Sequence, residues 1–172
     1  AASPDGTKVF VSCGDNTMRI VSTSSNTEIA KIPVGAGPGK PIASNTHVYV
    51  SNVSSNNVSV IDTATSTVVA TVAVGLNPTT GVFGTGNQYS SFGNNLYVPN
   101  RNAGSISVIS TSSNTVISTI PGQSQISEAA VAPVLSSVGP LLFASKINAG
   151  KLAILSQDPV NASTVGSSIP VG

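Results

Sequence analysis

Short hydrophobic runs recur along the chain, and clusters of Gly, Asn, Ser and Thr separate them. Four of the runs share one pattern, in which an aromatic residue takes the second of four positions: 9–12, 48–51, 96–99 and 142–145. These runs begin 39, 48 and 46 residues apart. A period of roughly 40–50 residues is typical of proteins built from one repeated unit. The spacing therefore predicts a repeat protein.

Each repeat contains further segments that read as strands. A polar turn follows the aromatic run, and apolar and small polar residues then alternate, as in Val58-Ser59-Val60 and Ile106-Ser107-Val108. Alternation with a period of two is typical of a β-strand. A Ser/Thr-rich corner leads to a third run that closes on Gly, and a short segment rich in small residues precedes the aromatic run. Each repeat is thus expected to form four strands, and no stretch has the periodicity of a helix.

This pattern predicts an all-β fold, namely a β-propeller with about four blades in this chain, each a four-stranded antiparallel sheet. The approximate blades are 1–35, with its inner strand missing, then 36–75, 76–122 and 123–172. A lone blade would leave an apolar face in water, so blades are expected to stack. The aromatic residues at the shared position are predicted to fill the core between blades: Phe10, Tyr49, Tyr97 and Phe143.

The residues at this position resemble the YVTN family of β-propeller repeats. Tyr49-Val50-Ser51-Asn52 and Tyr97-Val98-Pro99-Asn100 are near matches to the motif that names the family, and 10–13 and 143–146 are degenerate ones. The flanking residues agree, since 3–8 looks like the first hairpin turn of the family's repeat. The resemblance covers essentially the whole chain and is specific for fold rather than for function.

The resemblance implies a surface-layer, secreted or periplasmic protein with six to eight blades. Some relatives with similar blades are lactonases or lyases, whose site residues converge on the central channel. Because only about four blades are read here, we expect the chain to be part of a larger ring. The alternative is a homo-oligomer in which two copies complete the ring. An extracellular or cell-surface location is the corresponding expectation.

The charge content narrows the range of partners. Charged residues make up 8% of the chain, and seven basic and six acidic side chains leave a formal charge of +1. Nucleic-acid binding requires clustered Lys and Arg to displace counterions from phosphates, and the basic residues here are scattered. No stretch approaches the roughly 18 apolar residues of a membrane helix. The sequence therefore argues against a nucleic-acid partner and against membrane insertion.

Two residues with catalytic potential, His47 and Cys13, are interpreted as structural. His47 is the single histidine and lies one residue before a strand, with no oriented nucleophile and acid beside it in the sequence. Cys13 lacks the helix N-terminus or neighbouring base that lowers a thiol pKa, although His47 occupies a similar region of the next repeat. A solvated histidine and an ordinary free thiol are the favoured interpretations, and no catalytic residue is assigned.

Glu128 is the carboxylate that stands apart, because it falls on a predicted innermost strand facing the channel. An acidic residue there is a candidate ligand for calcium or another hard cation. The equivalent strands offer 42–44 and 79–81, which contain no second carboxylate. The favoured expectation is therefore no metal and no cofactor, with Glu128 as the candidate ligand should a metal bind.

The segment 84–95 is longer than its counterpart at 45–46. Loops carry binding residues disproportionately, and this one holds two aromatic and two amide side chains suited to a sugar ring or a protein partner: Asn87, Gln88, Tyr89 and Phe92. Tolerance of an insertion is the competing interpretation.

These observations favour a non-catalytic extracellular or cell-surface β-propeller scaffold that binds a protein or another ligand, or assembles at a surface. Two alternatives stay open. One is a portion of a lactonase- or lyase-like propeller enzyme whose catalytic residues lie elsewhere, and the other is a carbohydrate-binding module.

Overall fold

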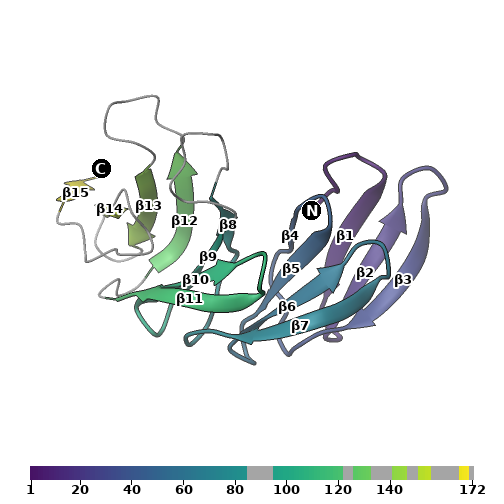
Figure 1. The fold of residues 1–172 in the computed structure, drawn as a ribbon, viewed down its shortest axis with the longest axis horizontal. Helices are drawn as coiled ribbons and strands as arrows, with labels where there is room; N and C mark the ends of the chain where they lie inside the picture. The colour runs from purple at the N-terminus through teal and green to yellow at the C-terminus, as the bar shows by residue number, and fades with distance from the viewer. Residues whose placement is uncertain (85–94, 122–125, 133–140, 147–150, 156–166, 171–172) are drawn as a thin grey trace. The chain divides into compact units, whose positions relative to one another are not determined.

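The computed structural model describes the backbone of residues 1–84, 95–121, 126–132, 141–146, 151–155 and 167–170, and the side chains of the first two ranges. The chain divides into two compact units, Ala1–Thr80 and Gly81–Gly172. Each unit holds two antiparallel sheets (Figure 1). The described residues contain strands and no helix, which confirms the all-β prediction.

The first unit is formed by seven strands. The first sheet has the order β1-β2-β3, with β1 (Lys8–Cys13), β2 (Thr17–Ser22) and β3 (Thr27–Pro33). The second sheet has the order β4-β5-β6-β7, with β4 (Ile42–Ala43), β5 (His47–Asn52), β6 (Asn57–Asp62) and β7 (Thr67–Ala73). Consecutive strands pair antiparallel in both sheets, as short hairpin turns require.

The second unit repeats this arrangement. The third sheet has the order β8-β9-β10-β11, with β8 (Val82–Phe83), β9 (Asn95–Asn100), β10 (Ser105–Ser110) and β11 (Thr115–Ile120). The fourth sheet has the order β12-β13-β14-β15, with β12 (Ile126–Ala132), β13 (Leu141–Lys146), β14 (Lys151–Leu155) and β15 (Ser167–Pro170). Within this unit β12 lies against β8 and β9, so the third and fourth sheets are neighbours.

The inner edge of the first sheet carries two residues in place of a fourth strand. Ala2 forms a bridge with Val9, as Ala43 of β4 pairs with Val48. The Ala1 amino group donates to the Phe10 carbonyl at 2.9 Å, and the Phe10 N–H donates to the Ala1 carbonyl at 2.7 Å. Ala1 and Ala2 therefore occupy the register that β4 holds in the second sheet.

The core of the first unit lies between its two sheets. Phe10, Met18, Ile20 and Ile32 of the first sheet form one buried cluster with three residues of the second sheet: Val48, Val50 and Ile61. Successive side chains of a strand alternate between faces, so Phe10 is buried while its neighbour Val11 is 41% exposed. The predicted core role of Phe10 is confirmed. Tyr49 and Tyr97 are also buried, whereas the side chain of Phe143 lies outside the described side chains.

An asparagine ends the second strand of the second and third sheets, and its amide joins that strand to the next. Asn52 Nδ2 donates to Asn57 Oδ1 at 2.7 Å and to Ser59 Oγ at 2.9 Å. Asn100 Nδ2 donates to two hydroxyls in the same way, at 3.1 and 2.9 Å. Both asparagines are fully buried, so these hydrogen bonds satisfy donors that water cannot reach. The last residue of the Tyr-Val-x-Asn motif therefore has a structural role.

The corner between the third and fourth strands of each repeat is a tight turn that ends in a left-handed residue. Asn26, Ser66 and Asn114 take φ values of 55°, 58° and 53° at equivalent positions. Each donates its N–H to the carbonyl four residues earlier, at 2.8–3.0 Å. Asn visits this region more easily than residues such as Ser. The second sheet therefore carries the least suitable residue of the three.

Replacing Ser66 with Asn is expected to stabilise the protein. The change relieves part of the cost of a left-handed serine, which we set at about 0.5–1 kcal/mol in the free energy of unfolding. Chemical denaturation followed by circular dichroism measures it. The reciprocal change Asn26→Ser should destabilise by a similar amount, and equal stability of both variants and the wild type would contradict this account of the turn.

Candidate functional site

A groove of about 300 Å³ lies at one end of the first unit, where turns of its two sheets meet. The turn before β1 supplies most of its lining, and the β4–β5 turn and the corner after β6 supply one residue each. The lining residues are Ser3, Pro4, Asp5, Thr7, Lys8, Asn45 and Thr63. Apart from Pro4, each of them contributes a charged group, an amide or a hydroxyl, so the groove is suited to a polar occupant.

Lys8 links the two sheets across this groove. Its Nζ atom donates to the Thr63 carbonyl at 2.6 Å, and the side chain is half-buried. Thr63 is itself held by its N–H, which donates to the Thr46 carbonyl at 2.9 Å. An ammonium group has three N–H donors. The contact with Thr63 therefore fixes the position of Lys8 and leaves donor capacity for an occupant.

Asp5 places a negative charge in the same groove. Its Oδ1 atom accepts hydrogen bonds from Ser3 Oγ at 2.6 Å, from the Thr7 N–H at 3.0 Å and from Thr7 Oγ1 at 2.9 Å. These bonds favour the ionised form, the Ser3 hydroxyl most strongly, and lower the pKa of Asp5 to about 2. The groove therefore holds a fixed cation and a fixed anion at neutral pH.

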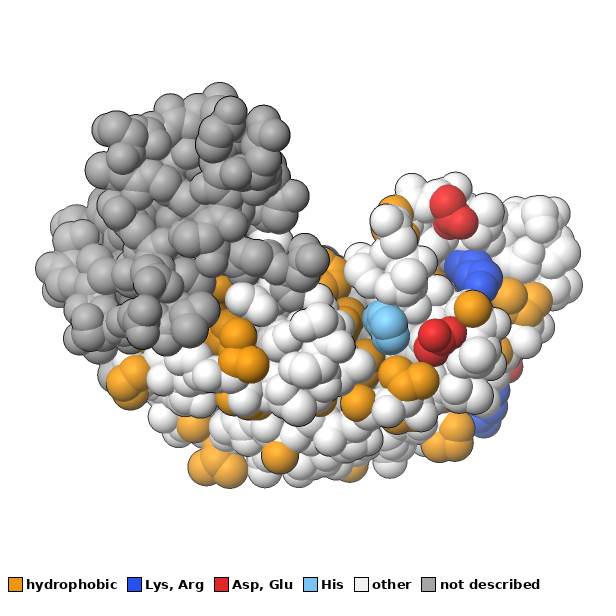
Figure 2. Space-filling model, viewed as in Figure 1, with side chains coloured by type: hydrophobic (Ala, Val, Ile, Leu, Met, Phe, Trp, Pro, Cys, Tyr) orange, Lys and Arg blue, Asp and Glu red, His pale blue; other side chains and the backbone are white. Residues whose placement is uncertain are grey.

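His47 and Asp62 lie close to this groove, at the start of β5 and the end of β6. They are cross-strand partners, and Thr46 Oγ1 is 2.9 Å from His47 Nδ1. The Thr65 and Ala64 N–H groups both donate to Asp62, which lowers the pKa of Asp62, and the nearby His47 adds a smaller effect. Figure 2 shows the histidine, in pale blue, at the surface near an acidic side chain. His47 is thus half-buried in a strand rather than in a solvated turn.

Cys13 and His47 are not brought together. Lys8, at the start of β1, reaches the Thr63 carbonyl beside the end of β6, where His47 pairs with Asp62. Cys13 is five residues further along β1, which corresponds to roughly 16 Å of extended strand. Its Sγ atom lies 3.9 Å from the Val11 carbonyl and the side chain is half-buried. The possibility of a Cys–His pair, open from the sequence, is therefore wrong.

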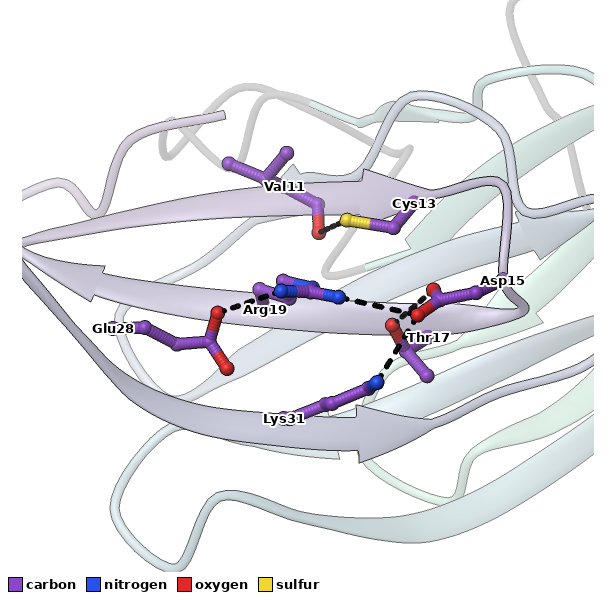
Figure 3. A network of polar contacts seen from close by, with 7 residues as sticks. All are labelled: Val11, Cys13, Asp15, Thr17, Arg19, Glu28 and Lys31. Carbon is purple, nitrogen blue, oxygen red and sulfur yellow. Dashed lines mark hydrogen bonds and ion pairs between the residues drawn. The ribbon is translucent and has the colours of Figure 1, made fainter.

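A network of four charges covers one face of the first sheet (Figure 3). Arg19 lies between Asp15, at 3.2 Å, and Glu28, at 3.0 Å, and Lys31 is 3.1 Å from Asp15. Thr17 Oγ1 donates to Asp15 at 2.5 Å. The Thr17 hydroxyl, followed by the two cations, holds the pKa of the Asp15 carboxyl well below its usual range. The protein has seven basic and six acidic side chains in all, and four of these charged side chains thus form one network on the first sheet.

The four binding residues predicted in the segment 84–95 lie outside the described residues: Asn87, Gln88, Tyr89 and Phe92. Glu128 lies on β12, where its backbone pairs with Ser145 of β13 after an irregularity in register. β12 is the first strand in the order of its sheet, as β4 and β8 are. The side chain of Glu128 is outside the described side chains, so its role as a metal ligand stays a prediction.

Within the described part of the chain, no three His, Cys, Asp or Glu side chains are close enough together to hold a metal ion. The described residues also contain no helix long and apolar enough to cross a membrane.

The groove was not predicted from the sequence, because the residues on its two sides are far apart in the chain. Lys8 and Thr63 are separated by 55 residues. One feature of the sequence could have indicated it. Lys8 stands at the start of its strand, in the position that His47 and Asn95 take in theirs. Aligning the repeats by strand register would have shown a lone lysine at this place, next to the predicted hairpin turn that carries Asp5.

Comparison with known proteins identifies the fold. No family model and no curated protein matches the chain. Among solved structures, Kuenenia stuttgartiensis hydrazine synthase matches with a TM-score of 0.75 and 18% identity, over 95% of this chain and 47% of that one. A functionally unknown protein from Desulfotomaculum acetoxidans matches with a TM-score of 0.71 and 19% identity, over 100% and 55%.

The dihydro-heme d1 dehydrogenase NirN, in complex with DHE, matches with a TM-score of 0.72 and 15% identity, over 100% of this chain and 37% of that one. Hydrazine synthase and NirN are β-propeller-like, and together with the four antiparallel sheets they show a β-propeller fold for this chain. The chain spans about half the length or less of the structures it matches.

Proposed function

We propose that this protein is a β-propeller binding scaffold and that the groove at the end of the first unit binds a polar ligand. The observation that carries the proposal is the pairing of a fixed cation with a fixed anion: Lys8 is held by the Thr63 carbonyl and Asp5 by three hydrogen bonds. Groups already held in position lose little conformational freedom on binding, which favours affinity.

The contacts of the carboxylates support a scaffold rather than a catalyst. Asp5 accepts the N–H of Thr7, and Asp62 accepts the N–H groups of Ala64 and Thr65, so each carboxylate shapes its own turn. Asp and Asn commonly form turns in this way. A general base needs the reacting proton within hydrogen-bond reach, whereas the Oδ1 atom of each of these acids already accepts hydrogen bonds from backbone and hydroxyl groups of its own turn.

A carbohydrate is the ligand class that suits the groove best. Adjacent sugar hydroxyls both donate and accept hydrogen bonds, and the rim offers an ammonium donor, a carboxylate acceptor and the Asn45 amide, which does both. This places the carbohydrate-binding alternative within the scaffold proposal. A polar segment of a partner protein is the other occupant that such a rim accommodates.

An enzymatic setting is the second candidate function. Two of the structural neighbours are an enzyme named for hydrazine synthesis and a dehydrogenase. At 15–18% identity these neighbours bear on fold alone. If the protein is an enzyme, the described repeats form part of a larger propeller, and Glu128 on the innermost strand is the candidate channel residue. Loss of an activity of the complete protein on Glu128→Gln, with the groove variants unaffected, would favour it.

A secreted or cell-surface location, and membership of the YVTN family, are part of the same proposal. A surface made soluble by Ser, Thr and Asn, with only 8% charged residues, supports them together with the Tyr-Val-x-Asn motifs. Fractionation of producing cells tests the location. Recovery of the protein solely from the cytoplasm would contradict it.

Replacing Lys8 with Met is expected to weaken ligand binding at least tenfold, corresponding to about 1.4 kcal/mol. Met keeps most of the apolar stem and removes the ammonium group. The purified chain is first screened on a glycan array, and hits are measured by isothermal titration calorimetry. Lys40→Met is the matched control, because Lys40 is exposed and does not line the groove.

Two results would contradict the proposal. If no glycan on the array binds, the proposal of a carbohydrate ligand is wrong. If the Lys8→Met variant binds a glycan from the array with wild-type affinity, the groove is not the binding site. Thermal denaturation of both lysine variants separates loss of binding from loss of the fold.

A further inference from the structure

The outermost strand of each of the first three sheets contains an irregularity at the same place. β3, β7 and β11 form the outer edges of their sheets, at the end opposite β1, β4 and β8 (Figure 1). Ile20 of β2 pairs with Ala30 of β3, and the next pair is Val21 with Glu28, so that Ile29 is left without a cross-strand partner. The same shift in register leaves out one residue of each of the other two strands, Val69 and Ile117. Such an extra residue is a β-bulge.

The extra residue contributes little to its own sheet. The side chains of Ile29, Val69 and Ile117 are 51%, 50% and 44% exposed, so they add little to the core. The pairing does not need them either. Removing Val69 would keep every cross-strand pair of β6 and β7 and would make the row of pairs continuous. A feature that recurs in three repeats without serving its own sheet points to a role at the outer edge.

The outer edge is the part of the sheet that a bulge changes. An edge strand presents a row of unpaired N–H and C=O groups, which a further strand can join. A bulge bends the strand and increases its twist locally, so it breaks the regular spacing that a further strand requires. Within the described residues no strand pairs with the outer edge of β3, β7 or β11.

The composition of the three edge strands differs. Proteins protect exposed edges with short strands, charged residues, proline or bulges. β3 contains Glu28, Lys31 and Pro33. β7 and β11 are seven and six residues long, and they contain no charged residue and no proline. Segments rich in β-branched residues and free of charge pair readily with copies of themselves. In β7 and β11 the bulge is therefore the only one of these protecting features.

We propose that the bulges at Val69 and Ile117 prevent the outer edges of β7 and β11 from pairing with strands of other molecules. The bulge at Ile29 acts in the same way on β3, where Glu28 and Lys31 provide a second barrier. Any assembly of copies then uses surfaces other than these edges. The proposal is independent of the groove, whose lining includes no residue of these strands.

Deletion of the extra residue provides the test. Analytical ultracentrifugation of the chain without Val69 is expected to show a weight-average mass at least about twice that of the wild type at concentrations on the order of 100 µM. Deletion of Ile117 should have the same effect, because each deletion creates a continuous, charge-free edge. Deletion of Ile29 should leave the mass unchanged, since the edge of β3 keeps its charges.

Two further variants locate the association on the edge. Val69→Ala keeps the extra residue and should sediment as the wild type does. Thr71 is an exposed residue of β7, and Thr71→Lys in the chain without Val69 places a charge on the same strand. This second change should restore the wild-type mass, because lysine disfavours pairing at an edge. Circular dichroism and thermal denaturation show whether each variant is folded.

Three outcomes would overturn the proposal. The first is that the folded chains without Val69 and without Ile117 both sediment as the wild type does. The second is that both deletions abolish folding, because the extra residue is then required within its own sheet. The third is association that Thr71→Lys does not reverse, which would place the contact away from the edge of β7.

Discussion

Replacing Phe10 with Ala lowers the free energy of unfolding by about 3–5 kcal/mol. Phe10 is 1% exposed and belongs to the cluster that joins the first and second sheets. Its removal deletes buried apolar surface and leaves a cavity, because Ile20 and Val48 beside it belong to hydrogen-bonded strands that relax only in part. Urea denaturation followed by circular dichroism measures the loss.

Val11→Ala is the matched control for this change. Val11 is the next residue of β1 and points to the opposite face, where it is 41% exposed. At micromolar concentration its truncation should cost under about 1 kcal/mol, because substitutions on an open face have small effects. Equal losses for the two variants would show that the two faces of the first sheet are not distinguished as the structure has them.

Replacing Gly35 with Ala is expected to lower the free energy of unfolding by about 1–3 kcal/mol. A Cβ atom at this position would lie 2.7 Å from the Cγ and Nδ2 atoms of Asn52. Asn52 is fully buried and its amide is bound to Asn57 and Ser59, so it has no room to move away without losing those hydrogen bonds. The cost therefore combines overpacking with a weakened buried amide.

Gly14→Ala tests whether this cost comes from the close approach rather than from glycine itself. No atom lies within 4 Å of a Cβ built at Gly14, and its φ is not positive. That change should be neutral or slightly stabilising, since alanine reduces the entropy of the unfolded chain. The double variant Gly35→Ala/Asn52→Ala should lose less than the two single changes together, because the clash is gone once Asn52 is shortened. Strict additivity would contradict the contact.

The sequence was sufficient to predict the repeat, the strands and part of the core. Alternation in segments such as 58–60 fixes which side chains share a face, and the periodic aromatic position identified Phe10 as a core residue. Local turn chemistry was also readable, since Asp62 binds the N–H groups of its own corner as Asp commonly does. These features depend on residues that are close in sequence or related by the repeat.

The groove and the network of four charges on the first sheet depend on contacts of a different kind. Lys8 meets Thr63 only because two sheets pack together, and a single sequence carries no direct signal for such a contact. The four-charge network was closer to being predictable from the sequence. Arg19 and Lys31 replace hydroxyl residues of the other repeats, and a register alignment would have placed them side by side on neighbouring strands. Reading the basic residues as scattered was correct for the chain as a whole and missed this local cluster.

The central claim is that the groove at the end of the first unit is the binding surface of the scaffold. The most direct measurement is a two-dimensional amide NMR titration of the isotope-labelled chain with a glycan found on the array. The account predicts that the backbone amide signals of Thr7, Lys8, Asn45 and Thr63 shift together and saturate with one dissociation constant. Shifts confined to Gln88, Tyr89 and their neighbours, with the groove signals unmoved, would contradict it and would return the site to the segment 84–95.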